Sequence, residues 1–293
     1  MPDTYFVLTE RRRFALHVHR TGWRTAGEIA YELAAIRHLA TKSVSVATPV
    51  AAADGSWLRV VAAPEGPRQL VLFHEAVGRE AYADPGYPVS FAQSMAALHA
   101  AGDDFHADQP RCKVDLTTLL DRPLARIAPE LTQQPNSLER WGYLTGLAER
   151  LRRAVAALPA AGLGWGPCHG DALGSNAHLA GSVETDTITH FDFDDCGPGW
   201  RVYDLATFRW IAVRRCSAAD ADACWAAYLR GYRQVRAIPE LDLAAVPLVV
   251  GLRELWLMGQ HARMAPLRGR WVTSFGPRLD FLHQWDQQHL AGI

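Results

Sequence analysis

The stretch 168–206 carries side chains whose types and spacing could do chemistry. Asp171 stands in a His-Gly-Asp sequence, Asn176 follows five positions later, and Asp192 lies near the end of an apolar run. Phosphoryl transfer from a nucleotide needs one carboxylate to orient the incoming hydroxyl, together with an amide and a second carboxylate that hold magnesium against the phosphates. Magnesium prefers hard oxygen ligands and usually takes only one or two protein carboxylates. The pattern therefore predicts a kinase of small molecules, with a protein kinase as the less favoured alternative.

The bulk composition narrows the class of protein. A chain of 293 residues, 49% apolar and 21% charged, is ordinary for a globular protein of one or two domains. A formal net charge of -1 gives no electrostatic case for binding nucleic acid or an anionic membrane. Five cysteines, an odd number without a C-x-x-C pair, argue against a disulfide framework or a zinc site and favour a reducing compartment.

Neither a signal peptide nor a membrane span is predicted. The first ten residues lack a basic region followed by an apolar core. The most apolar segment, 241–259, contains Asp242, Pro247, Arg253 and Glu254, so it is interpreted as a buried helix. We therefore expect a cytoplasmic protein that acts without a membrane.

The first part of the chain predicts a small sheet that carries one helix. Thr25 and Glu28 form a capping-box pattern, and apolar residues at helical spacing follow it, which predicts a helix over 26–40. Short β-prone runs predict strands on both sides of this helix, and Pro49 makes 44–53 an edge or a bend. The predicted strands are 4–8, 14–19, 57–62 and 69–73.

The character of the chain changes after Gly78. Alanine- and leucine-rich segments predict helices over 90–101, 138–158, 218–231 and 243–261. The clearest β-like interruption is a hairpin formed by 177–179 and 187–193, with Asn176 entering it and Asp192 near its exit. The expected fold class is α+β and bilobal, with a small β-rich N-lobe over 1–77 and a larger, mainly helical C-lobe over 78–293.

Three ordered motifs resemble those of the aminoglycoside phosphotransferase and choline kinase superfamily, a branch of the protein-kinase-like fold. These motifs are H-G-D-x-x-x-x-N at 169–176, F-D-F-D at 191–194 and Y-D-L-A at 203–206. The opening strands are similar to those of type II homoserine kinases. The segments 20–24, 28–40 and 192–195 are similar to those of bacterial stress-response kinases.

This resemblance implies roles for the residues of the motifs. Asp171 would be the catalytic aspartate that accepts or orients the proton of the substrate hydroxyl. Asn176 and Asp192 would bind magnesium against the phosphates of ATP. Asp204 would brace the catalytic loop. Asp194 and Asp195 are interpreted as solvated turn residues, with contact between Asp194 and magnesium or substrate as the alternative.

The resemblance also implies a nucleotide site in the N-lobe. The segment 73–78 resembles the hinge, where backbone groups of His74 and Ala76 would meet the adenine edge. Ala15 and His17 alternate onto one strand face, which would form the ceiling of the site. In the family, a lysine or arginine usually stands at the position of His17 and pairs with a helix glutamate, which here is Glu32.

Two departures from the family pattern leave an alternative function open. The chain has two lysines, neither on a predicted N-lobe strand, and a histidine anchors phosphate more weakly and in a pH-dependent way. The chain before Tyr5 is too short for the first strand and the phosphate-covering loop, and no G-x-G-x-x-G is present. A nucleotide-binding pseudokinase or regulatory module is therefore the alternative.

A metal-dependent phosphoesterase is disfavoured, because two-metal sites usually recruit several histidines and carboxylates together.

The acceptor is predicted only as a class. From Cys196 to the end, twelve arginines stand against eight acidic residues. A polycationic aminoglycoside would prefer an acidic groove, so this balance favours an acidic or zwitterionic metabolite. We expect a small-molecule hydroxyl substrate that is homoserine-, choline- or sugar-like, or, less favoured, a protein Ser/Thr. The oligomeric state stays open.

Overall fold

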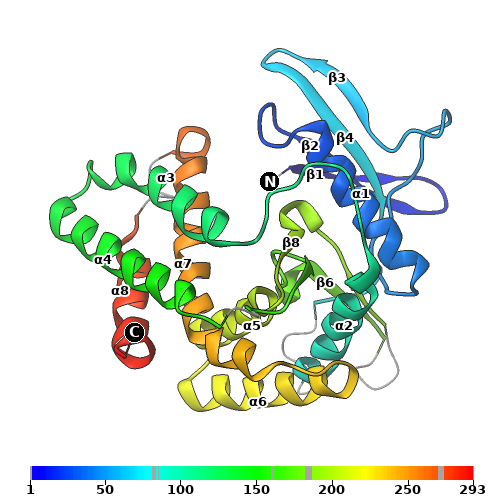
Figure 1. Ribbon diagram of the computed structural model, residues 1–293. Coiled ribbons are helices and arrows are strands. Elements are labelled where there is room, and N and C mark those ends of the chain that lie inside the picture. Colours follow the sequence, from blue (N-terminus) through cyan, green and yellow to red (C-terminus); the bar gives the residue numbers. More distant parts are fainter. Residues whose placement is uncertain are drawn as a thin grey trace. The chain divides into compact units, whose positions relative to one another are not determined.

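The structure is a computed structural model that describes residues 2–80, 84, 86–159, 162–181, 187–269 and 274–292 (Figure 1). The chain divides into two compact units, and each is built from three segments. Unit 1 comprises Met1–Cys112, Gly166–Pro198 and Arg215–Ile238. Unit 2 comprises Lys113–Trp165, Gly199–Arg214 and Pro239–Ile293.

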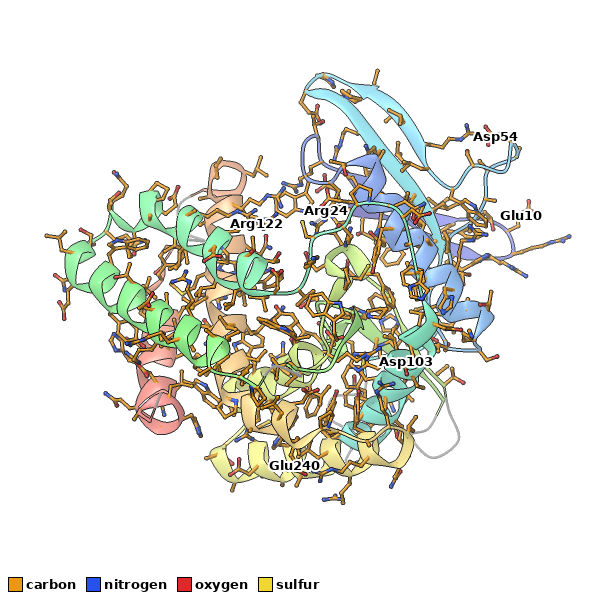
Figure 2. All side chains as sticks on the ribbon, viewed as in Figure 1. Glu10, Arg24, Asp54, Asp103, Arg122 and Glu240 are labelled. Atoms are coloured by element: carbon orange, nitrogen blue, oxygen red, sulfur yellow. The ribbon has the colours of Figure 1, made fainter. Side chains whose placement is uncertain are left out.

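Unit 1 begins with an antiparallel four-stranded sheet, drawn in blue to cyan in Figure 1. Its strands are β1 (Asp3–Leu8), β2 (Arg13–His19), β3 (Arg59–Ala63) and β4 (Gly66–His74), in the order β1-β2-β4-β3. Ala15 pairs with Phe73 and His17 pairs with Val71, so the predicted ceiling strand lies beside the strand that leads to the hinge. The β1–β2 turn, which carries Glu10, and the loop before β3, which carries Asp54, are exposed at these labelled residues (Figure 2).

Helix α1 (Ala26–Thr41) begins at the predicted capping box. The Thr25 side chain accepts a hydrogen bond from the Glu28 backbone N–H, and the Glu28 carboxylate accepts one from the Thr25 N–H. This reciprocal arrangement satisfies two backbone donors at the start of the helix. The helix buries one apolar stripe, which includes Ile29, Leu33 and Ile36.

Helices α2 (Tyr87–Ala101) and α6 (Ala218–Val235) pack closely within unit 1. The ring of buried His99 is hydrogen-bonded to the Tyr232 hydroxyl, with 2.6 Å between Nδ1 and Oη. Gly231 allows the two helices to approach, because a Cβ atom at this position would lie 2.3 Å from the carbonyl oxygen of Val89.

The motif residues of unit 1 lie on short elements. Strands β6 (Ala177–Ala180) and β7 (Thr187–His190) form the predicted hairpin. Single turns of 3₁₀ helix lie at Gly174–Asn176 and Phe193–Asp195. Strands β5 (Trp165–Cys168) and β8 (Gly197–Trp200) pair with each other, and both cross the boundary between the units in sequence.

Unit 2 is helical. It contains α3 (Arg122–Leu131), α4 (Ser137–Ala156), α5 (Val202–Arg215, whose last residue belongs to unit 1), α7 (Glu240–Arg268) and α8 (Gly276–Trp285). π-Helical turns cover Thr117–Asp121 and Asp286–Leu290. The fully buried Glu254 of α7 accepts hydrogen bonds from Trp210 at 2.6 Å and from Arg278 at 2.8 Å, which compensate its charge.

The elements agree with the α+β prediction, and the main differences have physical causes. The strands over 165–168 and 197–200 were not expected, because their Gly- and Pro-rich sequences lack a β-prone pattern. Helix α3 was not expected because Pro129 lies inside it. Within the described residues, no helix is both long and apolar enough to cross a bilayer. The lobe boundary after residue 77 stays a prediction.

We predict opposite effects of the same substitution at two helical glycines. Gly231→Ala should lower the free energy of unfolding by about 1–3 kcal/mol, because the added methyl group overlaps the backbone of α2. Gly142→Ala should raise it by about 0.5–1 kcal/mol, because nothing lies within 4 Å of a Cβ there and alanine favours a helix. Urea denaturation measures both values, and equal shifts in the two variants would contradict the packing of α6 on α2.

Candidate active site

The loop that follows β5 depends on a glycine. Gly170 has a φ of +82°, in the left-handed region, and a Cβ atom on it would lie 2.0 Å from the carbonyl oxygen of Asp195. A larger residue at position 170 would therefore push the loop away from the turn Phe193–Asp195. This contact places two of the sequence motifs side by side.

Asp171 and Asn176 contact each other directly. The Asn176 Nδ2 atom donates to the Asp171 backbone oxygen and to Asp171 Oδ2, both at 2.9 Å. The amide thus orients the carboxylate, and its own Oδ1 atom takes no part in this contact. The predicted catalytic residue and one predicted metal ligand are brought together by the tight turn Gly174–Asn176.

His169 has a structural environment. It is fully buried, its Nε2 atom lies 3.1 Å from the Phe191 carbonyl oxygen, and the Asp171 backbone N–H points at its Nδ1 atom at 3.3 Å. Because Nδ1 accepts and Nε2 must donate, these bonds assign the neutral tautomer protonated at Nε2. The ring holds the loop to the end of the hairpin.

Asp192 follows the hairpin in an unusual backbone conformation. Its φ of +60° and ψ of +61° lie in the left-handed region, which few residues other than glycine, asparagine and aspartate adopt readily. The Phe191 backbone N–H donates to the Asn176 backbone oxygen at 2.9 Å, so the segments that carry Asp192 and Asn176 are joined.

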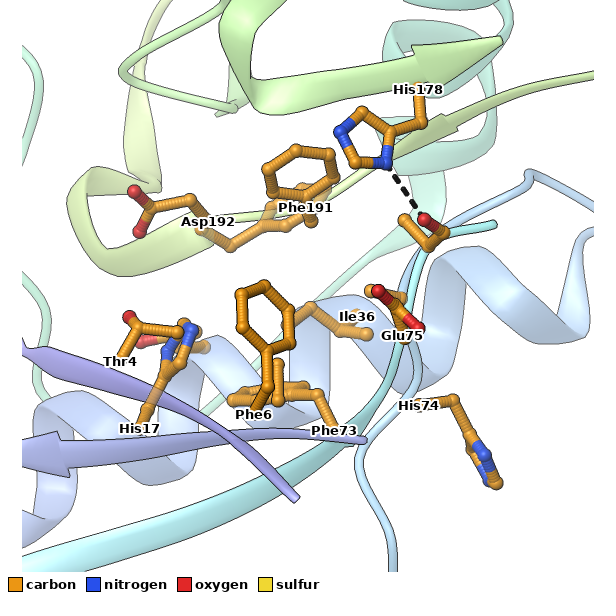
Figure 3. A pocket seen from close by; sticks show the side chains of 15 residues that line it. Thr4, Phe6, His17, Ile36, Phe73, His74, Glu75, His178, Phe191 and Asp192 are labelled. Atoms are coloured by element: carbon orange, nitrogen blue, oxygen red, sulfur yellow. Dashed lines mark hydrogen bonds between the residues drawn. The ribbon is translucent and has the colours of Figure 1, made fainter. Parts of the chain in front are cut away.

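Asp192 also lines a cavity of about 150 Å³ in unit 1 (Figure 3). The five residues predicted to bind the nucleotide line the same cavity: Ala15, His17, Glu32, His74 and Ala76. Asp171 and Asn176 are not among the lining residues. The cavity is mainly apolar, and it includes Phe73 and Glu75 of the predicted hinge segment. Sequence reasoning did not assign its other lining residues to the site, which are Thr4, Phe6, Ile36, Ala47, His178, Phe191 and Phe193.

The predicted hinge is attached to β6. His178 Nδ1 lies 2.7 Å from the Ala76 carbonyl oxygen, the contact dashed in Figure 3. Gly78 has a φ of +128°, and a Cβ atom there would lie 2.4 Å from the Leu179 oxygen. Arg79 and Leu179 exchange backbone hydrogen bonds at 2.9 and 3.1 Å. These contacts fix the backbone that the resemblance assigns to adenine recognition.

The charged groups around the cavity have displaced pKa values. Burial, with Asp194 and Asp171 nearby, raises the pKa of Asp192 to about 7. Burial and the charge of Asp194 raise the pKa of Glu32 to about 8, and burial lowers the pKa of His17 to about 4. Near neutral pH, His17 is therefore uncharged and Glu32 is largely protonated.

His17 and Glu32 form no ion pair with each other among the described residues. The His17 Nδ1 and Glu32 Oε2 atoms are buried, and within that part of the chain neither has a hydrogen-bond partner. The roles predicted for this pair, and for the other site residues, stay predictions. Asp204 is fully buried in α5, and its bracing role stays a prediction as well.

The turn Phe193–Asp195 is not solvated as expected. Asp194 is only 3% exposed, and its carboxylate accepts a hydrogen bond from Arg24 Nε at 3.1 Å. Burial alone would raise the pKa of Asp194, but the neighbouring guanidinium of Arg24 holds it well below its usual value. The interpretation of Asp194 as a solvated residue was wrong, because its partner lies 170 positions away in the sequence.

Comparison with known proteins identifies the family. A family described as the phosphotransferase enzyme family matches residues 2–238. The chain belongs to this family. The predicted membership and the prediction of a phosphotransferase with an alcohol acceptor are thereby confirmed.

Two relatives of this phosphotransferase align with most of the chain. An uncharacterized protein of Deinococcus radiodurans is 40% identical and covers 99% of this chain and 83% of its own length. A homoserine kinase of Burkholderia mallei is 30% identical and covers 87% of this chain and 72% of its own length.

Solved structures confirm the protein-kinase-like α+β fold. A microcompartment-associated aminopropanol kinase has a TM-score of 0.75 at 25% identity, covering 98% of this chain and 90% of that one. An amicoumacin kinase in complex with AMP-PNP, Ca²⁺ and Ami has a TM-score of 0.74 at 20% identity, covering 97% of this chain and 87% of that one.

The raised pKa of Asp192 predicts a pH dependence of stability without ligand. A carboxyl whose folded pKa exceeds its unfolded value of 3.8 stabilises the fold below pH 4, and this contribution is lost as the pH rises through about 7. Asp192→Asn should therefore gain stability over the wild type between pH 5 and pH 8, on the order of a few kcal/mol.

Urea denaturation at both pH values measures this difference. Asp280→Asn, which changes an exposed carboxyl on α8, is the matched control and should follow the wild type. Parallel pH profiles for Asp192→Asn and the wild type would contradict the raised pKa.

Proposed function

We propose that this phosphotransferase uses ATP and Mg²⁺ to phosphorylate the hydroxyl group of a small metabolite. The observation that carries the proposal is the single cavity lined by Ala15, His17, Glu32, His74, Ala76 and Asp192. These six residues come from two strands, a helix, the predicted hinge and the loop after β7, and the resemblance assigned all of them to nucleotide or metal binding.

The donor atoms suit a hard divalent cation. Asn176 uses its Nδ2 atom on Asp171, which leaves the amide oxygen for a metal ion. Asp192 supplies a carboxylate on the segment that the Phe191 N–H joins to the Asn176 backbone oxygen. A bound cation would offset the burial and the neighbouring carboxylates that raise the pKa of Asp192. When bound, magnesium neutralises the charge of the phosphates. The amicoumacin kinase, with AMP-PNP and Ca²⁺, is a neighbour whose ligands agree with this assignment.

Asp171 is the residue that would act on the acceptor. Its carboxylate, held by Asn176 at 2.9 Å, can accept the hydrogen bond of an incoming hydroxyl and orient its oxygen toward the phosphoryl group. His169 is not suited to this role because both of its ring nitrogens are engaged with the backbone. The catalytic task therefore falls to one carboxylate.

An amino alcohol or a hydroxy amino acid is the acceptor class that the relatives favour. One relative is a homoserine kinase and one structural neighbour is an aminopropanol kinase. Both named substrates combine a hydroxyl with an amine on a short carbon chain. The surplus of arginine over acidic residues after Cys196 is compatible with a zwitterion and unfavourable for a polycation.

A pseudokinase that binds the nucleotide without transfer is the second candidate. The observation that favours it is the neutral His17, which lines the same cavity as Glu32. No lysine stands at position 17 to neutralise the phosphates. Turnover separates the two functions, because a pseudokinase binds ATP and forms no product.

Two substitutions should separate nucleotide binding from transfer. Asp171→Asn should lower the rate of ADP formation with homoserine or aminopropanol about 10²–10⁴-fold, as expected for loss of a proton-accepting group. It should retain the magnesium-dependent rise in melting temperature with ATP, because ligand bound only to the folded state stabilises it. Asp192→Ala should lose both that rise and the activity.

Asp280→Asn serves as the control and should match the wild type in both assays. A wild type that binds magnesium-ATP and forms no product with either acceptor would favour the pseudokinase. An unchanged rate in Asp171→Asn would contradict the catalytic assignment.

Restoring a cation at position 17 should strengthen nucleotide binding. In His17→Lys, the ammonium can pair with Glu32 and approach the phosphates, so we expect the Kd for magnesium-ATP to fall about tenfold, or about 1.4 kcal/mol. Isothermal titration calorimetry measures the change. The same substitution in a Glu32→Gln background is the control, where the loss of the ion pair should reduce the gain. Weaker binding in His17→Lys would show that His17 does not face the phosphates.

A further inference from the structure

The turn Phe193–Asp195 is held by two arginines from distant parts of unit 1. Arg24, which lies directly before helix α1, donates from Nη2 to the Asp194 backbone oxygen and to Asp195 Oδ1, both at 2.6 Å, and from Nε to Asp194 Oδ1 at 3.1 Å. Arg111 donates to the backbone oxygens of Phe193, Asp194 and Cys196. One guanidinium thus binds mainly carboxylates, and the other binds the carbonyl groups of the same turn.

Both arginines also contact the first turn of α1. Arg111 Nη1 donates to the Glu28 backbone oxygen at 2.9 Å, and Arg24 Nη1 lies 3.8 Å from Glu28 Oε1. Glu28 is the capping-box residue of this helix. The start of α1 and the turn that follows Asp192 are therefore joined through two guanidinium groups.

This junction, which consists of Arg24, Arg111, Glu28 and the turn Phe193–Asp195, adjoins the predicted metal ligand. Asp192 immediately precedes the turn and has the left-handed φ of +60°, which surrounding contacts must maintain. The Asp194 carboxylate is additionally contacted by Trp23 Nε1 at 3.4 Å and faces His19 Nδ1 at 4.0 Å. The contacts to Asp194 and Asp195 therefore constrain the backbone from which the Asp192 carboxylate projects.

The junction is a charged connection between the start of α1 and this loop, since Arg24 lies within ion-pair distance of both Glu28 and Asp194. His17 and Glu32, the pair expected to connect β2 to α1, form no ion pair among the described residues. The side chain of Arg24 is only 10% exposed, and the charges of Asp194 and Asp195 raise its pKa further above the usual value. A buried, permanently charged fork matches two carboxylates better than an ammonium group could.

We propose that Arg24, assisted by Arg111, is a positioning residue that holds Asp192 in the orientation for binding the divalent cation. The assignment rests on the proposed function, since it concerns the metal site of the ATP-dependent reaction. Arg24 acts through Asp194 and Asp195 and touches neither the nucleotide nor the acceptor.

Arg24→Lys tests this assignment because it keeps the positive charge and loses the fork. The readout is the Mg²⁺ concentration that gives half of the ATP-dependent rise in melting temperature. We expect it to increase at least fivefold in Arg24→Lys, while the Kd for adenosine without metal changes less than twofold. Asp195→Asn, which removes one partner of Arg24, should shift the Mg²⁺ dependence in the same direction by a smaller factor.

Arg20→Lys is the matched control. Arg20 lies four positions earlier and pairs with Asp3 at 2.6 Å, away from the turn Phe193–Asp195, so this variant should retain the wild-type Mg²⁺ dependence. Unchanged Mg²⁺ dependence in both Arg24→Lys and Asp195→Asn overturns the assignment. An equal loss of affinity for adenosine and for magnesium-ATP also overturns it, since that result describes a general loss of structure.

The wild type distinguishes this failure from failure of the proposed function. If ATP raises the melting temperature of the wild type equally with and without Mg²⁺, the proposed function is overturned, and the assignment of Arg24 falls with it. If the wild type requires Mg²⁺ and the variants do not differ from it, only the positioning role is overturned.

Discussion

Compensation of buried negative charge is the constraint on which the site depends. Burial and the charge of Asp194 contribute to raising the pKa values of Asp192, Asp195 and Glu32 within unit 1, and uncompensated carboxylates in such surroundings destabilise a fold. The protein meets this constraint in two ways. Asp194 remains ionised because Arg24 binds it, whereas Glu32, whose buried Oε2 atom has no hydrogen-bond partner among the described residues, is largely protonated at neutral pH. The start of α1 and the turn Phe193–Asp195 are held together by the first of these, the binding of Asp194 by Arg24.

Local sequence patterns predicted the parts of the site that local structure forms. The capping box predicted the start of α1, and the motif residues Asp171 and Asn176, five positions apart, contact each other in the structure. The shared cavity of Ala15, His17 and Glu32 was accessible only through resemblance to a family, because these residues reach it from separate elements. The predicted roles themselves remain to be tested.

Long-range contacts explain what the sequence did not predict. Arg24 and Arg111 bind Asp194 at sequence separations of 170 and 83 positions, and neither arginine stands in a pattern that indicates a partner. Phe6 lies on a strand and Phe191 lies at the end of a hairpin. Aromatic residues are common in strands for reasons of packing, so these two gave no sign in the sequence that they line a cavity. One signal was available: three aspartates within four positions require cations nearby, and the arginines before α1 could have been considered for this role.

The left-handed backbone at Asp192 has a consequence for how this protein can change over generations. Asparagine and glycine are the other residues that adopt this conformation readily, and each is one base change away from either aspartate codon. A lineage can therefore exchange the carboxylate for a neutral side chain in a single step, without deforming the chain. Such a substitution would also remove the repulsion between Asp192 and its acidic neighbours. The shortest mutational route away from the Asp192 carboxylate thus leads to a folded protein that keeps this backbone conformation, and not to an unfolded one.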